Sequence, residues 1–278
     1  MHTTFPFLWL LSLPFLCASV PICLLTATLP PSATIGLIEQ LHLLPKVVKL
    51  IRSPTVCPNT VYSHFQLRCQ SPGDISPRHF INDSGSRMTM EDFLTDYDKT
   101  IQTDDHILVF CTTRQDTEEL GNLLNCGAYH ALMDADVQAQ TLNAWHRGSP
   151  SRILVSTSSL GAGVDWPSVR MVVHYKSPRN LLDYAQESGR GGRDGKLAYS
   201  VVFWDPEDSG IPLAPGQNPI GKNEIREWLL KEQCLRLILG EFLDGWARSC
   251  YDLSNVKLCA FCDAPIKVSC SLPLQSIV

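Results

Sequence analysis

The stretch from residue 152 to residue 195 constrains the fold of this 278-residue chain more than any other part. Two short apolar runs rich in β-branched residues, Ile153–Val155 and Val169–His174, are typical of strands buried on both faces. After the second run, Pro178 prevents the strand from continuing and Asn180 can cap a helix. The order strand, strand, helix predicts a parallel sheet with helices packed against it.

The predicted helix ends in QESGRGGRDG, residues 186–195, which places two arginines three residues apart among glycines. Guanidinium groups are planar, permanently charged forks that suit phosphate. Two arginines at this spacing, without other evidence, would usually belong to a solvent-exposed turn. Between positions 165 and 196, however, six Lys and Arg stand against four Asp and Glu, although the whole chain has a net charge of −5. Any phosphate contact is therefore expected in this stretch.

QESGRGGRDG resembles motif VI of superfamily 2 helicases, in the form found in the RecQ family. STSSLGAGVDWPSVRMVVHY, residues 156–175, resembles motif V of that family, and ILVFCTTR, residues 107–114, is similar to motif IV. VPICLLTATLPP, residues 20–31, is similar to motif III. The resemblance implies an α/β fold: a RecA-like helicase C-terminal lobe whose parallel sheet is covered by helices, followed by a small helical zinc-binding subdomain.

Four parts of the chain are expected from these motifs. They are a remnant of the first RecA-like lobe with an atypical apolar N-terminus (1–52), the second lobe (53–208), a linker with the zinc-binding subdomain (209–268), and a tail (269–278). Within them the patterns predict helices over 32–41, 117–124, 137–145, 223–230 and 232–243, and strands over 61–65, 107–111, 126–131 and 198–204. Residues 70–90 are predicted to form a polar loop, and Asp136 is predicted to cap the third helix.

The resemblance also assigns roles to site residues. They are the arginine finger Arg193 with Arg190 beside it; Gln186, Asp165 and Gly189 for nucleotide contact or lobe coupling; and Ser156, Thr157 and Ser158 for the DNA backbone. For the last three, a role as turn formers alone stays open. Asp183 and Glu187 are interpreted as solvated helix charges. The implied ligands are ATP with Mg²⁺ and single-stranded DNA or a single/double-strand junction, and the implied activity is 3′ to 5′ DNA unwinding in the nucleus.

The sequence contains no D-E-x-H box, and its nearest approach to a P-loop is GQNPIGKN, residues 216–223. This segment has Asn223 where a P-loop has Ser or Thr, and three prolines leave no strand before it. It is interpreted as a linker before a helix. ATP hydrolysis is therefore expected to need a first lobe, supplied by a longer protein or in trans. A catalytically silent module that binds nucleic acid or a protein partner is the alternative.

The first 38 residues contain no Lys, Arg, Asp or Glu. A secretory signal cleaved near Ser19 is one interpretation, but the positive n-region is missing and Pro6 and Pro14 interrupt any spanning helix. Because residues 20–31 resemble a helicase motif, an atypical start that replaces the upstream lobe is favoured, and no membrane partner is expected.

Four cysteines near the C-terminus have the spacing C-x15-C-x8-C-x2-C: Cys234, Cys250, Cys259 and Cys262. A C-x2-C knuckle with two further thiolates can complete a tetrahedral zinc site. The segment also resembles the zinc-binding subdomain of RecQ proteins, which implies a structural Zn²⁺. The odd total of eleven cysteines without regular spacing argues against a disulfide framework.

Overall fold

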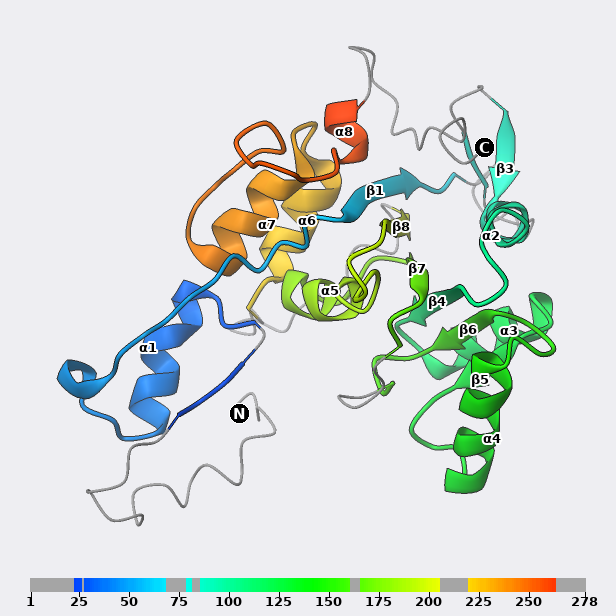
Figure 1. Ribbon diagram of the computed structural model, residues 1–278, viewed down its shortest axis with the longest axis horizontal. Helices are drawn as coiled ribbons and strands as arrows, with labels where there is room; N and C mark the ends of the chain where they lie inside the picture. The colour runs from blue at the N-terminus through cyan, green and yellow to red at the C-terminus, as the bar shows by residue number, and fades with distance from the viewer. Residues whose placement is uncertain are drawn as a thin grey trace.

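The computed structural model describes residues 23–26, 28–68, 79–81, 86–160, 166–205 and 220–263. Its main element is a six-stranded sheet in the order β1-β8-β7-β4-β6-β5, and every neighbouring pair is parallel. The strands are β1 (Thr60–Gln66), β4 (His106–Cys111), β5 (Gly127–Tyr129), β6 (Ile153–Ser156), β7 (Val169–Tyr175) and β8 (Ala198–Trp204). The predicted parallel α/β lobe is confirmed (Figure 1).

One face of the sheet is covered by α2 (Met90–Asp98) and α3 (Arg114–Leu123), whose apolar side chains join the largest core cluster. A group of phenylalanine rings fills its centre, with Phe65 stacked on Phe203 at 5.4 Å. Because each central strand is buried on both faces, its apolar run is continuous rather than alternating.

The opposite face is covered by α5 (Leu181–Ser188), α6 (Lys222–Leu230) and α7 (Leu235–Asp244), with α4 (Ala135–His146) toward the β5 edge. Tyr184 and Trp228 are completely buried here, with ring centroids 4.7 Å apart. The predicted helical hairpin of α6 and α7 is present, and α8 (Ala260–Asp263) follows it. Figure 1 shows α6, α7 and α8 grouped beside β1.

Helix α5 starts as the sequence predicts. The Asn180 side chain accepts a hydrogen bond of 2.8 Å from the Asp183 backbone amide, which is the N-cap geometry. Gly221 precedes α6 with φ +88°, and its carbonyl accepts a hydrogen bond of 2.8 Å from the amide of Leu181. A Cβ at position 221 would lie 2.9 Å from the Phe242 ring. Gly221 therefore serves close packing between helices, as expected of a helix start rather than a phosphate loop.

Two predictions were wrong in detail, and one helix was not predicted. The segment predicted as a polar loop contains two antiparallel strands, β2 (His79–Ile81) and β3 (Arg87–Thr89). Helix α2, which no prediction included, begins at a capping box between Thr89 and Asp92. Helix α4 is preceded by Asp134, so Asp136 lies in its first turn and is not its cap.

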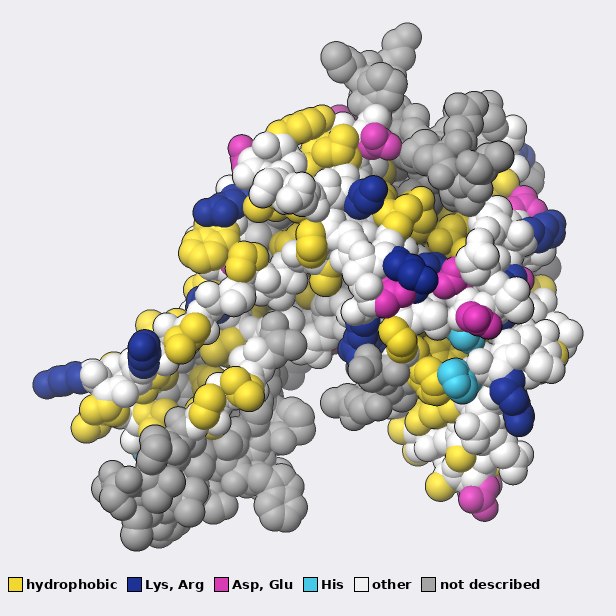
Figure 2. All heavy atoms as spheres, viewed as in Figure 1, with side chains coloured by type: hydrophobic (Ala, Val, Ile, Leu, Met, Phe, Trp, Pro, Cys, Tyr) yellow, Lys and Arg dark blue, Asp and Glu magenta, His cyan; other side chains and the backbone are white. Residues whose placement is uncertain are grey.

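Helix α1 (Pro31–Gln40) is present near its predicted bounds but buries none of its residues. The short 3₁₀ helix η2 (Pro45–Val47) follows it, and an extended connection then leads to β1. Large apolar side chains are exposed along this region, including Ile35 (69%), Val47 (74%) and Ile51 (80%). Figure 2 shows hydrophobic side chains gathered over α1 and the segment after it.

Candidate functional site

Arg190 and Arg193 lie in the glycine-rich turn that ends α5. Gly192 in this turn has φ +63°, and a Cβ there would lie 2.5 Å from the Asn59 side-chain nitrogen and 2.8 Å from the Lys196 carbonyl. That Asn59 nitrogen donates a hydrogen bond of 2.8 Å to the Gly192 carbonyl. Only glycine fits this position, and the turn is held close to the start of β1.

The turn lies at the amino end of the sheet. The amide of Gly192 donates a hydrogen bond of 2.9 Å to the carbonyl of Val169, the first residue of β7. Because ligands bind beyond the carboxyl ends of parallel strands, the motif V and motif VI segments are both expected there, and for the arginines this expectation is wrong. Helix α5 starts near the carboxyl end of β7 and runs back along the sheet, which carries its last turn to the opposite end.

The two arginines have different surroundings. Arg193 is exposed, and Arg190 is half-buried with its Nε buried and without a hydrogen-bond partner among the described residues. Burial, and then the positive charge of Arg193, lower the pKa of Arg190, while Glu187 acts in the opposite direction. An anion beside this pair would relieve both the desolvation and the like-charge repulsion.

Gln186, which was predicted to contact the nucleotide or to couple the lobes, reaches a distant segment. Its side-chain amide donates a hydrogen bond of 2.8 Å to the Thr28 hydroxyl, 158 positions away. Thr28 belongs to the stretch that resembles motif III. The same stretch is held by Arg52, which donates to the Leu29 carbonyl and, at 2.6 Å, to the Thr34 hydroxyl. The motif III and motif VI segments are thus in direct contact.

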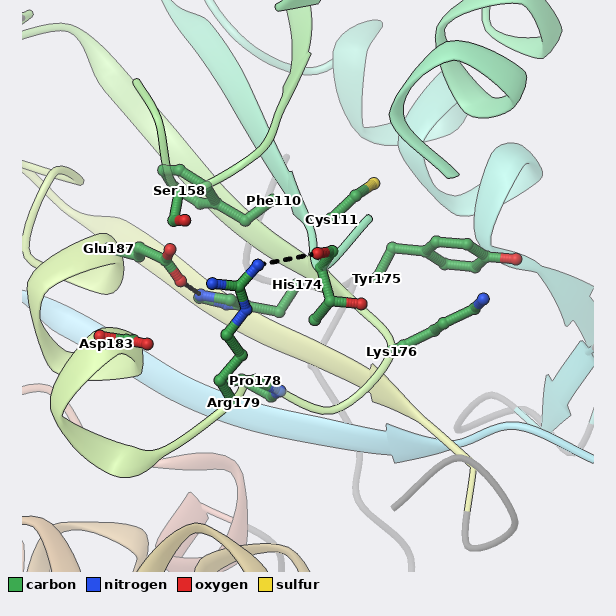
Figure 3. A pocket seen from close by; sticks show the side chains of 11 residues that line it. Phe110, Cys111, Ser158, His174, Tyr175, Lys176, Pro178, Arg179, Asp183 and Glu187 are labelled. Carbon is green, nitrogen blue, oxygen red and sulfur yellow. Dashed lines mark hydrogen bonds and ion pairs between the residues drawn. The ribbon is translucent and has the colours of Figure 1, made fainter. Parts of the chain in front are cut away.

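A pocket lies at the other end of the sheet, where β4 and β7 finish and α5 begins (Figure 3). Its lining residues are Phe110, Cys111, Thr112, Ser158, His174, Tyr175, Lys176, Pro178, Arg179, Asp183 and Glu187. Arg179 extends into its centre and donates a hydrogen bond of 3.0 Å to the Thr112 carbonyl. Lys176 has φ +72° and forms an ion pair of 2.7 Å with Asp116 in the first turn of α3. Two cations therefore sit beside the turn that resembles motif IV.

The acidic residues of α5 are not simple solvated charges. A Glu187 carboxylate oxygen lies within hydrogen-bond distance of His174 Nε2, at 3.0 Å, and the Glu187 side chain is only 13% exposed. Asp183 accepts a hydrogen bond of 2.9 Å from the Asn180 side chain, and burial together with the Glu187 charge raises its pKa. Both residues line the pocket.

Of the three hydroxyl residues predicted to contact DNA, one lines the pocket. Ser156 is completely buried and donates 2.8 Å to the Thr157 carbonyl, while the Thr157 hydroxyl lies 2.7 Å from that of Ser159. Ser158 is exposed and lines the pocket. Asp165 lies outside the described residues.

Lys176 and Arg179, which line the pocket, were not among the predicted site residues. A usable signal was present, because both cations directly follow a predicted buried strand, and ligands bind beyond the carboxyl ends of parallel strands. Glu187 and His174 carried no such signal, since their pairing depends on how α5 lies across β7.

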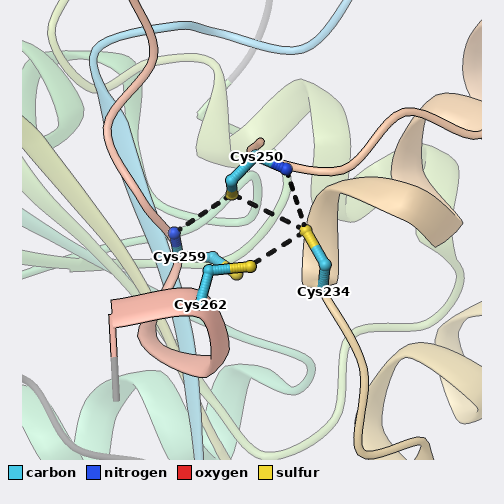
Figure 4. A group of neighbouring side chains, drawn as sticks. All are labelled: Cys234, Cys250, Cys259 and Cys262. Atoms are coloured by element: carbon cyan, nitrogen blue, oxygen red, sulfur yellow. Dashed lines mark hydrogen bonds between the residues drawn. The ribbon is translucent and has the colours of Figure 1, made fainter. Parts of the chain in front are cut away.

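The four C-terminal cysteines come together as predicted (Figure 4). Their sulfur atoms all lie within 4.8 Å of one another, with Cys234 Sγ 3.6 Å from Cys250 Sγ and 3.9 Å from Cys259 Sγ. Tetrahedral zinc with bonds of about 2.3 Å requires sulfur separations of about 3.8 Å. The amides of Cys250 and Cys259 each donate 3.3 Å to a cluster sulfur. Hydrogen bonds from the thiols of Cys250 and Cys259, and then from the amide of Cys250, lower the pKa of Cys234. The donor set and its geometry fit a metal ion.

Comparisons with known proteins agree with these motifs. Residues 89–195 match the family of the helicase conserved C-terminal domain. The ATP-dependent DNA helicase Q-like 2 of Arabidopsis thaliana is 29% identical over 194 residues, which are 68% of this chain and 25% of the relative. The ATP-dependent DNA helicase RecQ of Pasteurella multocida is 32% identical over 147 residues, 48% of this chain and 23% of the relative. The chain therefore spans only about a quarter of the length of these relatives.

A solved structure supports the same fold. The structure of Saccharomyces cerevisiae Dbp5 bound to RNA and ADP BeF₃ has a TM-score of 0.50, covering 68% of this chain and 46% of that one at 19% identity. At this identity the likeness concerns the fold alone. Within the described residues, no helix has both the length and the apolar character to cross a membrane.

Proposed function

We propose that this chain is the C-terminal portion of a RecQ-type helicase of superfamily 2 and forms the second half of an ATP-driven DNA-translocating motor; the helicase C-terminal domain match and the similarity to RecQ-type relatives support this. The observation that carries this proposal is the hydrogen bond between Gln186 and Thr28. It links the segment that holds the two arginines to a segment resembling the end of a first lobe. A contact of this kind is what coupling between nucleotide state and lobe position requires.

The arginine turn supplies the catalytic groups in this proposal. Arg193 is exposed at the end of α5 and would reach the γ-phosphate of ATP·Mg²⁺ held on a first lobe, stabilising charge in the transition state. Arg190 would lie beside it, with the backbone of Gly189 and the side chains of Gln186 and Asp165 near the nucleotide. The metal ion and the attacking water would be positioned by the first lobe, because this sequence has neither a P-loop nor a D-E-x-H box.

The exposed apolar surface of residues 24–51 supports the need for a first lobe. Leu25 is 92% exposed and Ile51 80% exposed, and contiguous apolar surface of this kind usually marks an interface. We propose that a first RecA-like lobe, in a longer form of the protein or in a partner polypeptide, covers it. The chain alone is then inactive in ATP hydrolysis.

The pocket at the carboxyl ends of the strands is the proposed contact for DNA. Arg179, Lys176 and the Ser158 hydroxyl surround a space that suits one phosphate of a single strand or of a strand junction. Movement from 3′ to 5′ and a nuclear location follow the RecQ relationship, and the cysteine cluster is proposed to hold a structural Zn²⁺.

DNA-stimulated ATP hydrolysis tests the proposal. The purified chain should show no turnover alone. Addition of the N-terminal lobe of the Arabidopsis relative should produce turnover, and Arg193→Ala should reduce it by about 10³-fold or more, as loss of an arginine finger does. The control is Arg147→Ala, an exposed arginine at the end of α4. Turnover by the pure chain that survives Arg193→Ala would refute the assignment.

The distance between the two ends of the sheet favours a second candidate, a silent nucleic-acid-binding module. The pocket that Lys176 and Arg179 line is at the opposite end of β7 from the arginine turn, so these two side chains can bind a phosphate without any nucleotide chemistry. This candidate predicts DNA binding by the chain together with no turnover under any complementation.

A further inference from the structure

Two charged side chains of α7 are buried against the connection that leads into β1, residues 52–60. Arg236 is completely buried and Asp244 is 6% exposed. A buried charge is costly unless it is paired or fully hydrogen-bonded. The burial of Arg236 and Asp244, in a helix next to the cysteine cluster, must therefore be compensated by hydrogen bonds.

Arg236 binds three backbone carbonyls from two segments. Its Nη1 donates 3.0 Å to Cys57 O, and its Nη2 donates 2.7 Å to Thr60 O and 3.0 Å to Lys257 O. The guanidinium carbon also lies 4.9 Å from the centre of the Tyr62 ring. The Arg236 side chain thus links residues 57 and 60 of the connection to Lys257, in the loop that carries Cys259.

The same residue is part of the cysteine cluster's surroundings. Arg236 stands two positions after Cys234, the N-cap residue of α7. Lys257 stands two positions before Cys259, and its amide donates 2.8 Å to the Pro58 carbonyl. Hydrogen bonds to residues 57–60 therefore come from a residue two positions from Cys234 and from a residue two positions from Cys259.

Asp244 holds the other half of the connection. Its carboxylate accepts hydrogen bonds of 3.0 and 3.2 Å from the Thr55 amide and of 2.5 Å from the Thr55 hydroxyl. At the next residue, Gly245, a Cβ would lie 3.1 Å from Pro31 of α1. Helix α7 therefore contacts the cysteine cluster at its start and both the connection and α1 at its end.

We propose that Arg236 and Asp244 are positioning residues that couple metal occupancy of the cysteine cluster to the order of the 52–60 connection, and so to the placement of α1. The coupling rests on the proposed metal site. Because linkage is reciprocal, metal binding orders the connection, and an ordered connection slows metal release. The position of Thr28, which precedes α1 and accepts the hydrogen bond from Gln186, then also depends on the metal.

Hydrogen exchange on the full chain, loaded with Zn²⁺ or stripped by a chelator, tests the first direction. The amides of Thr55 and Lys257 should exchange at least about tenfold faster in the stripped chain, in line with the cost of disturbing groups around a metal site. The amide of Ile107, which bonds to Arg152 O within the sheet, serves as the internal reference. Equal exchange of Thr55 and Lys257 in the two forms would overturn the coupling.

Zinc release to a chromogenic chelator tests the reverse direction. Arg236→Gln should speed release by about 10- to 100-fold relative to wild type. Thr55→Val alters the connection without touching any cysteine, and should still speed release by about two- to thirtyfold. Arg248→Gln, an exposed arginine over the Trp246 ring, is the matched control and should release zinc at the wild-type rate.

The outcomes separate the coupling from the metal site. If Arg236→Gln does not fold, Thr55→Val still decides the matter, because that change lies outside the cluster. A wild-type chain that binds no zinc refutes the metal site and the coupling together. A chain that binds zinc but whose release rate is unchanged by Thr55→Val refutes the coupling alone.

Discussion

Arg170 and Asp194 form a bidentate ion pair at the end of the turn that carries Arg190 and Arg193. The Nη1 of Arg170 donates 2.9 Å to one carboxylate oxygen of Asp194, and Nη2 donates to the other. The Nε of Arg170 donates 2.7 Å to Asp105 in the turn before β4. Hydrogen bonding by Arg170 lowers the pKa of Asp194. The turn is therefore fixed to the amino ends of β7 and β4 by one nearly buried guanidinium.

Arg170→Gln should lower the free energy of unfolding by about 2–4 kcal/mol, because it leaves two carboxylates without their charged partner. Urea denaturation at neutral pH measures this change. Arg147→Gln removes an exposed arginine and should change stability by less than about 0.5 kcal/mol. Equal stability of the two variants would show that the pair does not fix the turn.

Because His64 is buried, the protein is expected to lose stability in acid. Its ring lies 5.4 Å from Trp228 and 6.2 Å from Trp204, whose indole N–H donates to Nδ1. Burial lowers the pKa of His64 from 6.5 to about 4. The unfolded chain therefore binds more protons between these values, so stability should fall as the pH drops from 6.5 towards 4 and change no further through this group below that.

The expected loss at this position is up to about 3 kcal/mol, from about 1.4 kcal/mol for each unit of pKa difference. Unfolding of wild type and His64→Gln at pH 7.5 and pH 5 isolates the contribution, because the other titrating groups are common to both proteins. An identical pH dependence of the two proteins would rule out His64 as the cause.

The main strands and the site helix could be predicted because their signals are local. Apolar runs predicted β4, β7 and β8, and Asn180 predicted the start of α5. The cysteine cluster was predictable for a similar reason, since a C-x2-C knuckle has few other uses.

The remaining features depend on tertiary contacts. Strands β2 and β3 are three residues each, too short for any periodicity, and they form by pairing with each other. Arg236 was unpredictable because an arginine in a helix is normally exposed, and its burial follows from carbonyls that lie 21 to 179 positions away. The end of the sheet at which the arginines lie depends on the direction of α5, which a motif does not encode.

The positive charges of Arg179 and Lys176, in the pocket at the carboxyl ends of β4 and β7, are expected to support binding of single-stranded DNA. Arg179→Ala and Lys176→Ala should each weaken binding of an oligonucleotide uniformly across sequences, because a phosphate contact carries no base information. Each lost contact should also reduce the slope of log K against log salt by about 0.7. Fluorescence anisotropy at several salt concentrations measures both. Lys99→Ala, an exposed lysine paired with Asp96 on α2, should leave affinity and slope unchanged. Wild-type behaviour of both pocket variants would place the DNA elsewhere.

The cysteine cluster predicts one zinc ion per chain. Cys259 is completely buried and its sulfur lies 3.9 Å from that of Cys234, so Cys259→Ser removes a central member of the donor set. Elemental analysis of the purified protein should find the metal in wild type and not in Cys259→Ser. Metal affinity should fall by more than about 100-fold, since loss of an outer partner alone costs about 10- to 100-fold. Cys23→Ser replaces an exposed thiol outside the cluster and should retain the metal. A folded wild-type chain without metal, or full occupancy in Cys259→Ser, would show that these four thiols are not a metal site.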